Sequence, residues 1–236
     1  MTERSINLLE ITESAQSSAL KIAKQNLKNR KLHKFIPTKI IDNFFESPSL
    51  WRNFALNQEY TLPTNGTWPG KRTDFLNTLD EESFDLLAKN LLKVLPQYRG
   101  FSSLWASFHL IDESYGNGWV HDDDPELTVS GIIYLNPKAP TGSGTILYND
   151  QHDHTAKKYN DFFKQDVLFA DEKERKNLGK YREEHKSFFT PNMVIENIYN
   201  RCIIFDPRVW HSPGNFFGTT DNDARLTLVF FAKAVI

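Results

Sequence analysis

The feature that most constrains the fold is a series of short segments beyond Gly100, rich in β-branched and aromatic residues and mostly bounded by turn residues. Such a series is typical of the strands of an all-β sandwich or barrel. The chain has 236 residues, of which 39% are hydrophobic, so it can bury a substantial core. The segments are Phe101–Ile111, Leu127–Leu135, Thr145–Tyr148, Met193–Ile198, Cys202–Phe205 and Arg225–Phe231.

Helices are expected on the N-terminal side of these strands. Ser47 and Pro48 predict the start of a helix that runs to about residue 56, because proline is favoured at the first helical position. Thr78 and Glu81 have the spacing of a capping box, which predicts a second helix through about residue 95. The predicted class is therefore mainly β with flanking helices.

Two further segments stand apart from this pattern. Residues 1–34 contain many helix formers and lysines, and predict a solvated helical extension; an arm that binds nucleic acid or a partner is the alternative. Residues 35–236 are expected to form one domain, with a charged, helix-prone insert at about 149–191 that is too long for an ordinary turn. The extension and the insert are the segments through which a homodimer would form.

Composition narrows the partners and the compartment. The 28 Lys+Arg nearly balance the 30 Asp+Glu, so charge gives no general reason to expect nucleic acid. No secretory signal and no stretch of about 20 apolar residues is visible, so no membrane span is predicted. The single cysteine, Cys202, excludes an internal disulfide framework and favours a cytoplasmic setting. A metal would have to be held by imidazole and carboxylate.

Three residues form a candidate metal site. His121 and Asp123 are two residues apart, so on extended chain their side chains point to the same face. His211 follows the strand predicted at Cys202–Phe205. Two imidazoles and one carboxylate form the facial triad of non-haem Fe(II) oxygenases, although zinc also accepts these ligands.

Arg225 is a fourth candidate, because it lies on a segment with the pattern of a buried strand. A buried guanidinium needs an anionic partner, and its planar shape suits a carboxylate. The partner is either an internal Asp or Glu, or the distal carboxylate of a dicarboxylate cosubstrate. Arg208 is a rival, but it lies in a turn that contains proline.

Two further motifs lie between these residues, Ile132-Ile133-Tyr134-Leu135-Asn136 and Gly142-Ser143-Gly144-Thr145. Taken in order with His121-x-Asp123, His211 and Arg225, they resemble the 2-oxoglutarate/Fe(II) dioxygenase superfamily, and most closely its prolyl 4-hydroxylase-like branch. Many prolyl 4-hydroxylases have lysine in place of Arg225, which leaves the identity within the branch open. The resemblance implies a double-stranded β-helix core, also called a jelly roll, which is cupin-like.

The resemblance also implies roles for single residues. His121, Asp123 and His211 would bind iron, and Arg225 would bind the C5 carboxylate of 2-oxoglutarate. Three hydroxyl groups would lie on the cosubstrate side of the site, those of Tyr134, Thr227 and Tyr115.

The implied activity is that of a hydroxylase with Fe(II), 2-oxoglutarate and O₂ as cofactor and cosubstrates. It would hydroxylate a C–H of an amino-acid or peptidyl substrate, or of a small metabolite, and release succinate and CO₂. Trp68, Arg72 and Trp119 are candidates for substrate contact, whereas His152 and His154 lie in a polar loop and are expected at the surface. The alternatives are a cupin-like metalloenzyme that does not use 2-oxoglutarate, and a jelly-roll binding module without catalysis.

Overall fold

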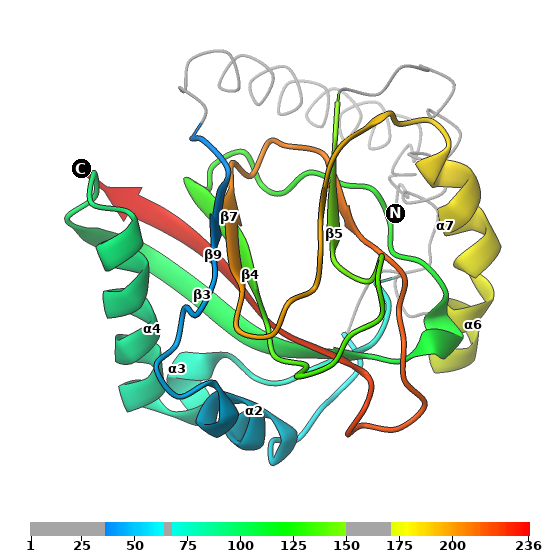
Figure 1. Cartoon of the computed structure of the whole chain (residues 1–236), viewed down its shortest axis with the longest axis horizontal. Helices are drawn as coiled ribbons and strands as arrows, with labels where there is room; N and C mark the ends of the chain where they lie inside the picture. The colour runs from blue at the N-terminus through cyan, green and yellow to red at the C-terminus, as the bar shows by residue number, and fades with distance from the viewer. Residues whose placement is uncertain (1–35, 64–67, 150–170) are drawn as a thin grey trace, which may run out of the picture. The chain divides into compact units, whose positions relative to one another are not determined.

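The structure, a computed structural model, describes residues 36–63, 68–149 and 171–236, and its elements are shown in Figure 1. The helices are α2 (Pro48–Leu56), α3 (Leu76–Leu79), α4 (Glu81–Val94), the 3-10 turn η1 (Glu113–Tyr115), α6 (Glu172–Asn177) and α7 (Gly179–Lys186). The strands are β1 (Lys39–Ile41), β2 (Lys71–Arg72), β3 (Gly100–Ile111), β4 (Val129–Tyr134), β5 (Thr145–Tyr148), β6 (Pro191–Ile195), β7 (Cys202–Phe205), β8 (His211–Pro213) and β9 (Arg225–Val235). The extension predicted for residues 1–34 lies outside the described residues.

The strands form two antiparallel sheets. The larger has the order β1-β7-β4-β9-β3-β2, and the smaller has the order β6-β5-β8. Strand β9 lies between β3 and β4, and its pairing with β3 extends from Gly100↔Val235 to Ile111↔Arg225. This mainly antiparallel architecture, with few helices, confirms the predicted class and its jelly-roll core.

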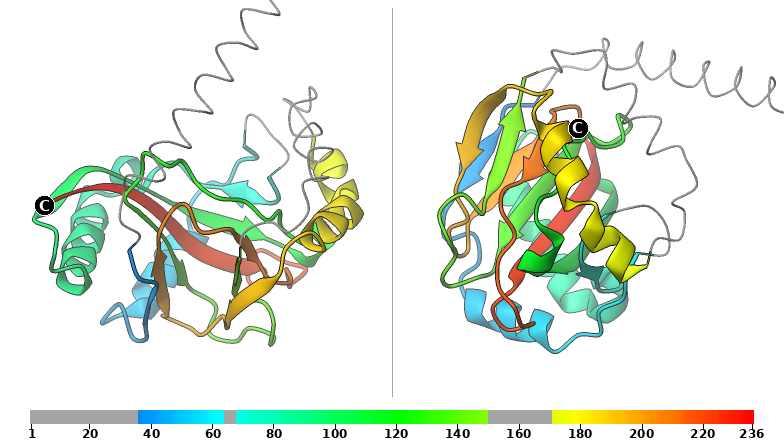
Figure 2. Two further views of the ribbon diagram at one scale, coloured as in Figure 1. Left: turned by 90° about the horizontal axis from the view of Figure 1, so that it is seen from above. Right: turned by 90° about the vertical axis from the view of Figure 1, so that its right-hand side faces the viewer.

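The two faces of the larger sheet have different neighbours. Because side chains alternate along a strand, Leu226 and Leu228 point to one face while Arg225 and Thr227 point to the other. The face with the leucines packs against α2, α3 and α4, which lie along one side of the sheet in Figures 1 and 2. The opposite face looks toward the smaller sheet and bears the candidate site.

The first helices anchor this arrangement through buried apolar residues. Leu87 and Leu91 of α4 are both fully buried, and each such side chain stabilises the fold by about 1.5–3 kcal/mol. Helix α2 starts at Pro48, as predicted. The capping box predicted at Thr78 is wrong, because Thr78 lies within α3 and the N-cap of α4 is Asp80, whose carboxylate accepts a hydrogen bond from the backbone N–H of Ser83.

The described end of the insert forms α6 and α7, which extend along the opposite side of the molecule from α4 in Figure 1. Two arginines tie these helices to earlier loops. Arg175 donates hydrogen bonds to the carbonyls of Trp68 and Pro63, and Arg182 donates to the carbonyl of Tyr115. His152 and His154 fall outside the described residues. Within the described ranges, no helix is both long enough and apolar enough to cross a bilayer.

Candidate metal centre and adjoining pocket

His121 and His211 are brought together by their own backbones. The N–H of His121 donates to the carbonyl of His211 over 2.9 Å, and the N–H of His211 donates to the carbonyl of His121 over 2.8 Å. The N–H of Asp123 donates to the carbonyl of Pro207 over 2.8 Å. The segment that contains the H-x-D motif is therefore held by β8 at His121 and by the turn between β7 and β8 at Asp123.

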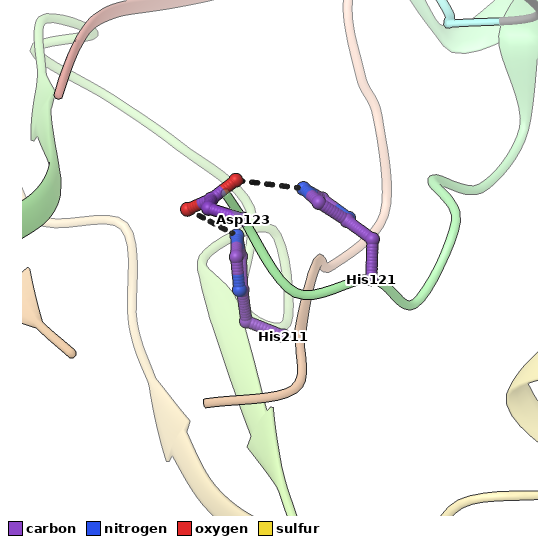
Figure 3. A group of neighbouring side chains, drawn as sticks. All are labelled: His121, Asp123 and His211. Carbon is purple, nitrogen blue, oxygen red and sulfur yellow. Dashed lines mark ion pairs between the residues drawn. The ribbon is translucent and has the colours of Figure 1, made fainter. Parts of the chain in front are cut away.

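The three side chains converge, as Figure 3 shows. His121 Nε2 lies 3.8 Å from Asp123 Oδ1, and His211 Nε2 lies 3.7 Å from Asp123 Oδ2. These distances are too long for hydrogen bonds. The potential ligand atoms of all three residues lie within 4.8 Å of one another, so the group has the size of a single-ion site.

The second ring nitrogen of each histidine fixes its tautomer. His121 Nδ1 is 3.0 Å from the carbonyl of Trp119, and His211 Nδ1 is 2.9 Å from the carbonyl of Val209. Because a carbonyl only accepts, each Nδ1 must be the protonated nitrogen, which leaves the Nε2 lone pairs directed at Asp123. Backbone support of this kind is what orients histidine ligands in metal sites.

Charge at the site favours neutral imidazole. Burial, together with the neighbouring His211, lowers the pKa of His121 to about 4, although Asp123 acts in the opposite direction. A neutral His121 cannot neutralise the Asp123 carboxylate, whose Oδ2 is buried without a hydrogen-bond partner among the described residues. A cation held by the two Nε2 atoms and this carboxylate would satisfy all three groups, so the residues present fit a divalent metal.

Arg225 lies deep on the same face, at 3% exposure. Its Nε donates to the carbonyl of Ser143 over 3.2 Å, and its guanidinium carbon is 5.7 Å from the centre of the Tyr134 ring. Its Nη2 is buried without a hydrogen-bond partner in the described part of the chain. The rival Arg208 is committed elsewhere, because its Nε and Nη2 each donate to Asp206 over 2.7 Å.

The turn at residues 142–145 holds this arginine in place. Gly142 has a φ of +80°, and a Cβ on Gly144 would lie 1.8 Å from the carbonyl oxygen of Ile195, so both positions require glycine. Besides the Ser143 carbonyl, the turn supplies Thr145, whose hydroxyl accepts a 2.7 Å hydrogen bond from Tyr134. The motif thus positions both Arg225 and Tyr134.

Thr227 shares the buried face of Arg225, and its Oγ1 is also buried with no hydrogen-bond partner among the described residues. Tyr115 is not part of this group. Its hydroxyl is 3.5 Å from Oε1 of Glu172 in α6, whereas the hydroxyl of Tyr134 bonds Thr145. None of Tyr115, Tyr134 and Thr227 is among the residues that line the cavity at the metal centre.

A cavity of about 530 Å³ is lined by the metal-site group His121, Asp123 and His211 and also by Arg225. Trp68, Arg72 and Trp119, which the sequence suggested as substrate contacts, all line it. The ring of Trp68 stands edge-on to that of His121, with centroids 4.6 Å apart. Trp119 is fully buried, so it forms part of the wall.

Sequence reasoning did not single out His109 and Ser107, which line the same cavity from β3. His109 pairs with Thr227 across the β3–β9 ladder and with Arg72 across the β2–β3 ladder. Along β3 these two residues alternate with the buried apolar residues Ala106, Phe108 and Leu110. This alternation indicates that Ser107 and His109 point to the face opposite the apolar core, which is the face of the cavity.

Three solved structures illustrate what this fold is similar to. HygX from Streptomyces hygroscopicus, solved with nickel and 2-oxoglutarate, has a TM-score of 0.51 at 13% identity, covering 83% of this chain and 82% of HygX. A prolyl hydroxylase from Trichoplax adhaerens, in complex with a hypoxia-inducible-factor peptide, has a TM-score of 0.50 at 14% identity over 97% and 94% of the two chains. SnoN, an α-ketoglutarate-dependent epimerase from nogalamycin biosynthesis, has a TM-score of 0.50 at 9% identity over 89% and 83%.

At these identities the matches establish the fold alone, a jelly roll. Comparison with curated proteins gives no sequence match. The chain itself belongs to the family of unknown function DUF6445, whose model matches residues 23–232.

Proposed function

We propose that the protein is an Fe(II)- and 2-oxoglutarate-dependent dioxygenase that hydroxylates a C–H of an amino-acid or peptidyl substrate, with release of succinate and CO₂. The proposal is supported by the His121, Asp123 and His211 group and by the jelly-roll fold. The observation that carries it is the buried, unpartnered Nη2 of Arg225 in the same cavity, because this arginine fits an anion that the described chain does not supply.

The chain's residues have separate tasks in this proposal. His121, Asp123 and His211 would hold Fe(II), which supplies the redox chemistry that couples O₂ reduction to cosubstrate decarboxylation. Arg225 would bind the C5 carboxylate of 2-oxoglutarate, with Thr227 as a further hydrogen-bond donor on the same face.

Tyr134 would keep the guanidinium of Arg225 in place. Its ring lies against the guanidinium, and its hydroxyl donates a hydrogen bond to the hydroxyl of Thr145. Burial around these residues excludes water, which strengthens the attraction between the arginine and the carboxylate.

The test measures succinate formation from 2-oxoglutarate with Fe(II) and O₂, and the affinity of the Ni(II)-loaded protein for 2-oxoglutarate. Asp123→Ala is expected to weaken metal binding at least about 10-fold, because it removes one of three ligands. Arg225→Gln is expected to leave metal affinity intact and weaken 2-oxoglutarate binding about 10-fold or more, since it removes a charge-assisted contact.

Arg201→Gln is a matched control, because this arginine is engaged by Asp42 through Nε and Nη2 away from the cavity. It should change neither affinity. If the metal-loaded wild type forms no succinate and does not bind 2-oxoglutarate, the proposal is wrong. Metal binding without 2-oxoglutarate binding would point to a cupin-like metalloenzyme.

A further inference from the structure

The cavity contains a second arginine, whose surroundings differ from those of Arg225. Arg72 is half-buried on β2, and its Nε donates to Nε2 of His109 over 3.2 Å. The hydroxyl of Ser107 also lies 3.2 Å from that nitrogen. Because the Nε of arginine only donates, His109 Nε2 must be an acceptor, so this imidazole is neutral and protonated on Nδ1.

Arg72 has no acidic partner within the described residues. Its only side-chain hydrogen bond there is the one to His109, and no carboxylate forms an ion pair with it. Asp122 and Asp124 line the same cavity, but neither is paired with Arg72. Burial and, to a smaller extent, the charge of Arg175 lower the pKa of Arg72 to about 10. Among the described residues, therefore, no carboxylate is in direct contact with the guanidinium of Arg72.

The proposed cofactors do not supply a partner for Arg72 either, because their charges are matched by other groups. A divalent metal with Asp123 and Arg225 carries two net positive charges, and the two carboxylates of 2-oxoglutarate neutralise them. Asp122 and Asp124 line the cavity as well, but the guanidinium of Arg72 still has no anion in direct contact with it among the described residues, and a cation removed from water is costly unless an anion accompanies it. Its two Nη groups are the part of the guanidinium that His109 leaves available.

Position separates this cation from the cosubstrate end of the cavity. Both arginines pair with residues of β3, Arg225 with Ile111 and Arg72 with His109. Along β3, Arg72 therefore lies two residues away from Arg225, the residue proposed to bind the cosubstrate. Arg72 also follows the loop of Trp68, whose ring stands against the metal ligand His121. An anion at Arg72 would thus lie beside the aromatic wall.

We infer that the primary substrate bears an anionic group, a carboxylate or a phosphate, that binds the Nη face of Arg72 while His109 holds the guanidinium in position. This inference rests on the proposed function and names the class of substrate: an acid whose reacting carbon lies near the metal. In this arrangement the side of Trp68 is available to the apolar part of the substrate.

The first arm of the test titrates 2-oxoglutarate into the Ni(II)-loaded full chain, for wild type, Arg72→Gln and Arg225→Gln. The Arg225 variant is expected to lose affinity, whereas Arg72→Gln should stay within about twofold of wild type. Weakening by Arg72→Gln equal to that of Arg225→Gln would assign Arg72 to the cosubstrate and overturn the inference.

The second arm adds matched probes to the Ni(II) protein saturated with 2-oxoglutarate, and measures the melting temperature and the dissociation constant. The pairs are N-acetyl amino acids against their primary amides, and O-phospho-L-serine against L-serine. At least one acid should bind about 10-fold more tightly than its neutral counterpart, as expected for a charge-assisted contact. The two kinds of pair distinguish a carboxylate from a phosphate.

Arg72→Gln should abolish the preference for the acid, and Arg72→Lys, which keeps the charge, should restore part of it. Lys71→Gln is the matched control, because Lys71 is the neighbouring cation on the opposite face of β2, and it should keep the preference. A panel without any preference for acids, or a preference that survives Arg72→Gln, overturns the inference. If the chain binds no Ni(II) or 2-oxoglutarate, the proposed function fails, and the same probes on the unloaded protein still test Arg72.

Discussion

The Gly144→Ala substitution tests how tightly the turn at residues 142–145 is packed. The added Cβ would lie 1.8 Å from the carbonyl oxygen of Ile195. Carbon–oxygen contacts are normally about 3.3–3.6 Å, so β5 and β6 would have to separate by about 1.5 Å. A shift of that size breaks the ladder hydrogen bonds where Thr145 pairs with Ile195.

The loss of unfolding free energy expected for Gly144→Ala has two contributions. Overpacking costs about 1–3 kcal/mol, and each lost hydrogen bond costs about 1 kcal/mol, so a destabilisation of about 2–4 kcal/mol is expected. For a domain of this size, each kcal/mol lowers the melting temperature by about 2–4 °C, which gives a drop of about 5–15 °C. Because the Ser143 carbonyl moves with the turn, 2-oxoglutarate affinity should also fall.

Thermal unfolding followed by circular dichroism measures the first effect, and titration of the Ni(II) protein measures the second. Gly100→Ala is the control, because a Cβ at Gly100 meets no atom within 4 Å. The reasoning is refuted if Gly144→Ala melts within about 2 °C of the Gly100→Ala protein, a difference that corresponds to less than about 1 kcal/mol.

Three other substitutions have expected outcomes. Asn136→Ala removes a buried amide that bonds the N–H of Leu226 at 2.7 Å and should lower the unfolding free energy by about 2–3 kcal/mol in urea titration, with Asn136→Asp less damaging if the accepting oxygen dominates. Asp206→Ala leaves Arg208 buried without its bidentate partner and should lower the unfolding free energy by about 3–5 kcal/mol. Burial alone would raise the pKa of Asp206, but the hydrogen bonds from Arg208 outweigh burial and lower that pKa below its usual value. The wild type should therefore lose this stabilisation as the pH falls below about 4. Tyr134→Phe keeps the ring against the guanidinium and should cost only about 1 kcal/mol in thermal unfolding, so a loss of more than about 3 kcal/mol would contradict the hydrogen-bond assignment.

Local pattern was sufficient for the longer strands and for α2, because alternation and turn residues act over a few positions, but it did not reveal the short strands β2 and β8. Strands β7 and β9 match the segments predicted at Cys202–Phe205 and from Arg225. The start of α4 was missed because two capping patterns overlap there. Leu76 is drawn into the core, which makes α3 a separate turn and shifts the N-cap to Asp80.

The candidate site could be predicted in its residues but not in its contacts. Nothing local to His121 or His211 indicates that their backbones pair, and the resemblance supplied that link. The Arg72–His109 contact depends on the register between β2 and β3, which a two-residue strand hardly encodes in its sequence. The roles assigned to Tyr115, Tyr134 and Thr227 stay predictions.

The central place of β9 has a consequence for how the protein is made. β9 is the last strand of the described chain, yet both of its edges are occupied, by β3 on one side and β4 on the other. During synthesis β3 and β4 therefore wait with open edges, and the larger sheet closes only after residues 225–235 have left the ribosome. We expect folding of the larger sheet to be slow, because β9 pairs with β3 across a long stretch of intervening sequence.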